Sequence, residues 1–156
     1  TRHDHEQRTS LNIAGNAGAG IIALLFSNYP AFFGAISAAL SDTLSSEIGL
    51  LSKKNPMLIT NMKEVEPGTD GGVTLLGFAG AFFGAIVISL LFLFFFGSPL
   101  IAFSIFIGGM AGAIVDSFLG AIFQQRKILD NNQVNFIATA TGALVVFLFQ
   151  VFTLGV

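Results

Sequence analysis

Three acidic residues stand inside otherwise apolar stretches of this sequence, and their side chains are the best candidates for chemistry. Asp42 and Glu47 fall within residues 31–51, and Asp116 falls within residues 99–123. An acid at the centre of a membrane helix costs about 2.5–3.5 kcal/mol, so each needs a compensating partner. Hard oxygen ligands suit Mg²⁺, which usually keeps several waters and joins carboxylates to substrate phosphates. We predict that Asp42, Glu47 and Asp116 are catalytic metal ligands; hydrogen bonding between helices is the alternative role.

A glycine-rich segment, Glu66-Pro67-Gly68-Thr69-Asp70-Gly71-Gly72, leads directly into the apolar stretch that begins near Val73. Its glycines let the backbone approach a ligand closely, and the N-terminus of a following helix offers unpaired N–H groups and a positive dipole to a phosphate. Lys53, Lys54 and Lys63 stand nearby in the sequence. Most glycine-rich turns are only turns, but beside intramembrane acids this one indicates a phosphate cradle.

Amide side chains occur near the starts of two apolar stretches. They form the cluster Asn131-Asn132-Gln133-Val134-Asn135 before the last stretch, and Asn12 and Asn16 follow Arg8 at helical spacing near the first. Helix capping is the plain interpretation of the Asn131 cluster. Contact with a ribose or a phosphate is the alternative.

Five apolar stretches must position these side chains, and we predict them as helices at about residues 11–26, 31–51, 73–96, 99–123 and 134–156. Of the 156 residues, 53% are hydrophobic and 10% are charged, far from the average of a soluble domain. At about 1.5 Å per residue, the stretches are long enough, or nearly so, to cross a hydrocarbon core of about 30 Å. No alternating barrel pattern is present. We therefore expect residues 1–156 to form one all-α, polytopic transmembrane helix bundle, itself a fragment of a larger bundle.

Long polar segments alternate with short uncharged turns along the chain. The polar segments cover residues 1–10, 52–72 and 124–133, and they contain all seven Lys and Arg residues. Five crossings place these segments on one side of the membrane, and the positive-inside rule makes that side cytoplasmic. Loops 52–72 and 124–133 are therefore predicted to form the active face. The net charge of −2 gives no support for nucleic-acid binding, and the absence of cysteine excludes disulfides and thiolate chemistry.

Four blocks of the sequence resemble one family of membrane proteins. The blocks are Ser41–Gly49, Pro67–Gly77, Gly112–Ala121 and Asn131–Asn135, and they follow the family's order and approximate spacing. That family unites plant and cyanobacterial phytyl-phosphate kinases with many bacterial and archaeal proteins and a human transmembrane relative. It is more distantly similar to dolichol kinases and phosphatidate cytidylyltransferases.

This resemblance implies transfer of a phosphoryl group from a nucleoside triphosphate, with CTP favoured, to an isoprenoid monophosphate such as phytyl or geranylgeranyl phosphate, as in tocopherol biosynthesis. Mg²⁺ is the expected cofactor. The location implied is a bacterial, archaeal or cyanobacterial plasma membrane, or a plastid membrane with the active face toward the stroma. The residues expected to bind nucleotide or lipid phosphate are Arg8, Asn12, Asn16, Ser46, Lys53, Lys63, Pro67, Gly68, Thr69, Gly71, Gly72, Ser117, Asn132 and Asn135.

Other activities fit the same residues. In a cytidylyltransferase, the lipid phosphate would attack the α-phosphate of CTP and give a CDP-lipid. A cation or proton transporter would use the acids as a relay, although they gather toward one face. A structural subunit would leave the acids unexplained, and homo-oligomerisation stays open.

Overall fold

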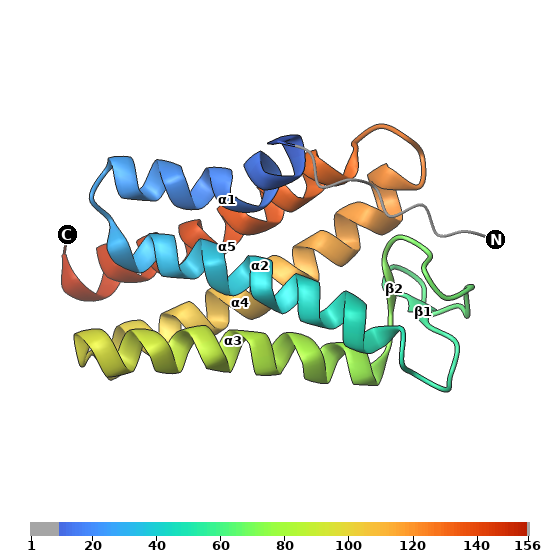
Figure 1. Ribbon diagram of the computed structural model, residues 1–156, viewed down its shortest axis with the longest axis horizontal. Helices are drawn as coiled ribbons and strands as arrows, with labels where there is room; N and C mark the ends of the chain where they lie inside the picture. Colours follow the sequence, from blue (N-terminus) through green and yellow to red (C-terminus); the bar gives the residue numbers. More distant parts are fainter. Residues whose placement is uncertain (1–9, 156) are drawn as a thin grey trace.

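Five helices and one small antiparallel sheet make up the computed structural model, which describes residues 10–155 (Figure 1). The helices are α1 (Ser10–Leu25), α2 (Tyr29–Gly49), α3 (Leu75–Phe96), α4 (Pro99–Leu119) and α5 (Asn131–Leu154), and α4 continues into a π-helix, η1 (Gly120–Gln124). Strands β1 (Met57–Leu58) and β2 (Gly72–Val73) pair with Met57 opposite Val73. The predicted fold class, an all-α membrane bundle, is confirmed.

Capping residues set the helix ends that border the polar loops. At the start of α3, Thr74 Oγ1 accepts a hydrogen bond from the Gly77 N–H at 2.9 Å. At the start of α5, Asp130 and Gln133 form a reciprocal capping box. Each cap satisfies backbone N–H groups that have no partner within the helix. The capping interpretation of the amides before the last helix therefore holds for Gln133.

Three helical segments in the described part of the chain are long and apolar enough to cross a membrane, namely Leu75–Phe96, Pro99–Gln124 and Asn131–Thr153. A shorter apolar helix covers Asn12–Leu25. Helix α2 has 21 residues, but its second half carries several polar side chains. Because α2 packs against all four other helices, protein rather than lipid surrounds much of it. That position makes its polar residues tolerable.

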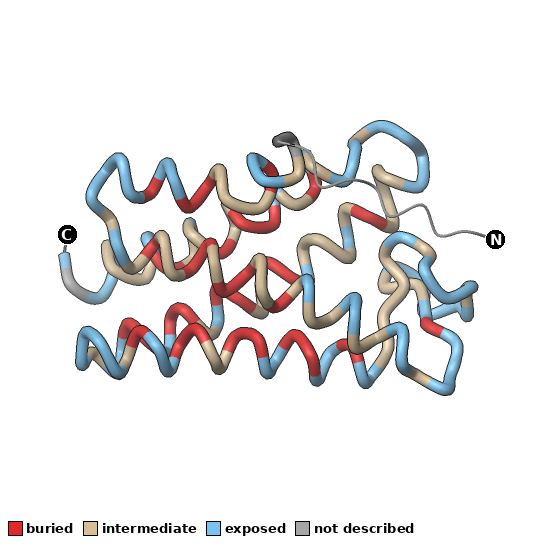
Figure 2. Tube along the Cα trace, in the orientation of Figure 1, coloured by how far each residue is buried: buried red, intermediate tan, exposed pale blue. Residues whose placement is uncertain are grey.

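The buried residues lie mainly where the helices pack against one another (Figure 2). Many of these buried residues are small, whereas many large apolar residues are exposed. Ala35, Ala38 and Ala85 are buried, while Phe94 and Phe95 are 82% and 70% exposed. In lipid, apolar side chains gain little from moving inside, and small residues let helix backbones approach closely. The exposed aromatic side chains are therefore suited to contact hydrocarbon.

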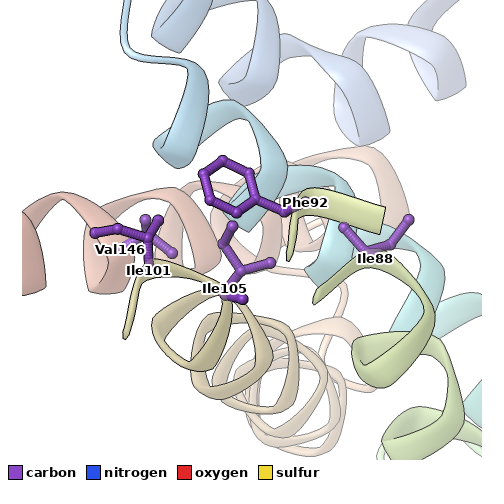
Figure 3. Close-up of a cluster of buried hydrophobic side chains, with 6 residues drawn as sticks. Ile88, Phe92, Ile101, Ile105 and Val146 are labelled. Carbon is purple, nitrogen blue, oxygen red and sulfur yellow. The ribbon is translucent and has the colours of Figure 1, made fainter. Parts of the chain in front are cut away.

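A cluster of larger side chains holds the helices together away from the polar loops (Figure 3). It joins Ile88 and Phe92 of α3 to Ile101 and Ile105 of α4 and to Val146 of α5. The long loops between α2 and α3 and between α4 and α5 lie together at the opposite end of the bundle (Figure 1). The bundle thus has a packed apolar end and an end where polar loops meet.

Candidate functional site

A polar cavity of about 220 Å³ lies at the loop end of the bundle, between α2, the loop after it, and the end of α4. Its polar side chains are Asp42, Ser45, Ser46, Ser52, Lys54, Thr69, Asp70, Thr74, Asp116, Ser117, Gln124 and Asn131, and Pro67, Gly68, Gly71 and Gly72 complete the loop wall. The intramembrane acids and the glycine-rich loop, which are far apart in the sequence, therefore share one cavity.

Two carboxyl groups meet in this cavity. The side chains of Asp42 on α2 and Asp116 on α4 are close enough to interact directly. Two ionised carboxylates this close repel, so the pair requires a proton or a cation between them. Asp70 of the loop adds its negative field at Asp116, and partial burial raises the pKa of the Asp70 carboxyl above its ordinary value. The cavity is therefore suited to concentrate positive charge.

A chain of amides holds Asp116 from the other side. In the amide orientation that satisfies its neighbours, Asn135 of α5 donates to Asp116 Oδ1 at 3.2 Å and accepts from Asn16 Nδ2 of α1 at 3.2 Å. Asn16 also donates to the Asn12 carbonyl oxygen at 3.0 Å. Through Asp116 and Asp42, this network joins four helices. Its members are partly buried, and such networks position their members when every group is paired.

The glycine-rich loop is attached to the end of α4. Gln125 Nε2 donates to the Asp70 carbonyl oxygen at 2.7 Å. Gly71, with φ of +74°, approaches so closely that an added Cβ would lie 2.6 Å from the Ser117 carbonyl oxygen. The helix has its π-helical turn at this point, and such turns are frequent at functional sites. The loop backbone is thereby brought next to Ser117 and the acid that precedes it.

Positive charge reaches the cavity from two sources. Thr74 lines the cavity and caps the start of α3, where the N–H groups of Leu75 and Leu76 have no acceptor within the helix. The positive end of the helix dipole favours an anion there. Lys54 is the one cationic side chain among the described residues that line the cavity. A polyanion could therefore be held on one side of the cavity and a cation at the acids.

The structure brings together many of the predicted catalytic and binding residues, but not all of them. Asp42, Asp116, Ser46, Ser117 and the loop residues 67–72 line the cavity. Asn16 and Asn135 reach it through Asp116.

Glu47 is exposed and lies outside the lining. Five residues of helix, at about 3.6 residues per turn, rotate it away from Asp42. No group of three or more His, Cys, Asp or Glu suited to a metal ion occurs within residues 10–155. Of the three predicted acids, the cavity therefore brings together Asp42 and Asp116.

The remaining predicted residues within the described range do not line the cavity. Lys53 and Lys63 are exposed and outside the lining, and Lys54 provides the cation instead. Asn132 is partly buried, and its side-chain oxygen has no hydrogen-bond partner. Arg8 lies outside the described residues.

The predicted site residues omit seven polar residues of the lining, which are Ser45, Ser52, Lys54, Asp70, Thr74, Gln124 and Asn131. Asp70 lies between two predicted residues, Thr69 and Gly71, so its place in the loop is a signal that could have indicated it. Gln124 and Gln125 belong to the distorted end of α4, and no feature of their spacing indicates that helix distortion.

A family model described as "Integral membrane protein DUF92" matches residues 1–143 of the chain. An uncharacterized membrane protein of Methanocaldococcus jannaschii is 38% identical over 151 residues, which cover 91% of this chain and 62% of that protein. Protein PGR of Arabidopsis thaliana is 34% identical over 136 residues (62% and 46%). The chloroplastic protein VTE6 of Arabidopsis thaliana is 31% identical over 167 residues (95% and 49%). The chain thus spans about half to three-fifths of the length of these relatives. No solved structure matches it.

Proposed function

We propose that this chain, which belongs to the DUF92 family of integral membrane proteins, transfers the γ-phosphoryl group of CTP to an isoprenoid monophosphate. The observation that carries the proposal is that one polar cavity brings two acids together with a glycine-rich loop and a helix N-terminus. The resemblance of four sequence blocks to phytyl-phosphate kinases supports the same reaction. Phytyl and geranylgeranyl phosphate are the acceptors that we favour.

The paired acids fit Mg²⁺. Asp42 and Asp116 offer hard oxygen atoms within reach of each other, and Asn135 orients the Asp116 carboxyl from behind. Mg²⁺ in phosphate-transfer sites is often bound by one or two carboxylates together with substrate phosphates and water, so a third acid is not needed. When bound, the ion would neutralise charge on the triphosphate oxygens.

The protein's other groups hold the two anions in line. Lys54, the loop backbone and the start of α3 would bind phosphate oxygens of the nucleotide. A bond forms between an oxygen of the lipid phosphate and the γ-phosphorus, while the bond from the γ-phosphorus to the β–γ bridging oxygen breaks and CDP leaves. The attacking oxygen is already anionic, so the reaction needs alignment and charge neutralisation rather than a general base.

Product analysis tests this proposal directly. We expect purified full-length protein with Mg²⁺, CTP and a panel of isoprenoid monophosphates to give a lipid diphosphate and CDP, both identified by mass spectrometry. Chelation with EDTA should stop the reaction, because two uncompensated acids would then repel the triphosphate. A CDP-lipid with pyrophosphate would instead identify a cytidylyltransferase. Ion flux into proteoliposomes without nucleotide would favour a transporter.

The cavity is further proposed to face the cytoplasm, or the stroma in a plastid, because the loops that border it carry Lys and Arg. The chain contains no cysteine, so single cysteines report sidedness cleanly. In intact cells, we expect a membrane-impermeant maleimide to label Ser98→Cys, in the α3–α4 turn, without permeabilisation. Asn55→Cys, in the loop after α2, should react only after permeabilisation. The reverse pattern would contradict the proposed orientation.

A further inference from the structure

A second cavity, of about 380 Å³, lies beside the polar one and is lined almost entirely by apolar side chains. Phe78 of α3 and Met110 and Ile114 of α4 form its walls, and Met57 and Met62 close it from the loop that contains β1. The chain has three methionines, and all of them line this cavity. Methionine side chains are flexible and adapt to irregular apolar shapes, which suits a branched hydrocarbon ligand.

The two cavities are continuous in their lining. Ser45, Thr74 and Ser117 contribute to both, so three hydroxyl-bearing residues lie at the junction. Ser117 directly follows Asp116 in the sequence. A molecule with an anionic head and an apolar tail would therefore place its head in the polar cavity, which Lys54 and the start of α3 border, and its tail in the apolar cavity.

The apolar cavity is short. Along α4 its lining runs from Ser117 back to Met110, a rise of about 10 Å at about 1.5 Å per residue. One turn further from the loops, Phe82 of α3 and Phe106 of α4 pack edge to face with ring centroids 5.1 Å apart. Because these rings join the two helices there, the cavity is much shorter than an extended phytyl or geranylgeranyl chain.

The side of the cavity is accessible from outside the bundle. Phe78 is 51% exposed and Ile114 is 39% exposed, and both belong to helices apolar enough to span the membrane. These exposed apolar side chains are suited to contact the hydrocarbon of a bilayer. A long chain could begin in the cavity and continue between α3 and α4 into the lipid.

We propose that this apolar cavity binds the end of the acceptor's hydrocarbon chain that is nearest the phosphate, while the rest of the chain extends into the bilayer. This inference rests on the proposed function. In this proposal, the protein recognises the part of the acceptor's hydrocarbon chain nearest the phosphate, rather than the full length of that hydrocarbon chain. Geranyl, farnesyl and geranylgeranyl phosphate should therefore be used with similar kcat, and isopentenyl phosphate, which cannot fill the cavity, should be a poor acceptor.

Ile114→Trp tests the cavity by filling it. We expect the KM for the isoprenoid monophosphate to rise about tenfold with the KM for CTP unchanged, because only binding of the acceptor is lost. Leu148→Trp on α5 is the matched control, because Leu148 is 41% exposed and lies outside both linings. An unchanged acceptor KM in Ile114→Trp, or an equal rise in both variants, would overturn the proposal.

Photolabelling separates this inference from the proposed reaction. A prenyl monophosphate with a diazirine on its first isoprene unit, used on the wild-type protein without nucleotide, should label peptides that contain Met57, Met62 or residues 110–117. Geranylgeranyl phosphate should compete with the label. Labelling there without any lipid diphosphate in the product assay would support the tail site and refute the kinase. Turnover with labelling elsewhere would refute the tail site alone, as would competition by phosphatidic acid but not by geranylgeranyl phosphate.

Discussion

Replacing Asp116 with Asn is expected to lower turnover about a thousandfold or more, because it removes one of the two carboxylates that can hold a cation against the triphosphate. The fold should survive. An Asn side chain has nearly the same shape, and its oxygen can still accept the hydrogen bond from Asn135 that Asp116 Oδ1 accepts now. Steady-state turnover with CTP and an isoprenoid monophosphate measures the loss, and thermal unfolding in detergent measures the fold.

Two control variants test whether the loss of turnover comes specifically from the paired acids. Glu64→Gln removes an acid from an exposed loop position outside the cavity lining and should leave turnover unchanged. Glu47→Gln distinguishes the sequence interpretation, which makes Glu47 a metal ligand, from the geometry, which leaves it outside the cavity. We expect near wild-type activity from Glu47→Gln. Wild-type activity in Asp116→Asn would remove this acid from the site.

Replacing Gly71 with Ala is expected to lower turnover about a hundredfold, since a misplacement of about 1 Å at a reacting centre can cost that much. The new methyl group would lie 2.5 Å from the backbone nitrogen of Ala121 and 2.6 Å from the Ser117 carbonyl oxygen. Backbone atoms cannot move aside as a flexible side chain does. The loop must therefore shift away from η1, and the hydrogen bond from Gln125 to Asp70 would be strained. Turnover and CTP binding would both report this shift.

Gly97→Ala is the control for Gly71→Ala. Gly97, at the end of α3 and outside the cavity lining, also has positive φ, +68°, but a Cβ there would have nothing within 4 Å. Its substitution costs about 1–2 kcal/mol for the left-handed backbone alone, without displacing the glycine-rich loop. We expect turnover within a few-fold of wild type. Equal losses in the two variants would show that contact with η1 does not position the loop.

The membrane character of this protein is predictable from its composition, because few backbone structures satisfy all their hydrogen bonds in lipid. Long apolar stretches must hydrogen-bond internally, so they become helices. Acidic residues inside those stretches are then conspicuous, because placing them in the membrane costs free energy. Asp42 and Asp116 were identified in this way, and the structure places both in one cavity with the glycine-rich loop.

Which face of each helix points inward depends on the packing between helices and cannot be predicted from one helix alone. Helix α2 carries two neighbouring polar stripes, one with Asp42 and Ser46 and one with Thr43 and Glu47. The spacing of residues within the helix does not show which of the two stripes faces the cavity. The packing of α2 against its neighbours leaves Thr43 and Glu47 exposed and places Asp42 and Ser46 in the cavity lining.

Residue type and local spacing are enough to predict the α-helical membrane fold and several of the groups that could do chemistry. Which of these groups meet depends on how the helices and loops pack. The tertiary structure joins Asn16 and Asn135 to Asp116, adds Asp70 to the cavity and creates the neighbouring apolar cavity. These features depend on contacts between segments far apart in the chain, and those contacts arise only when small residues let the helices pack closely.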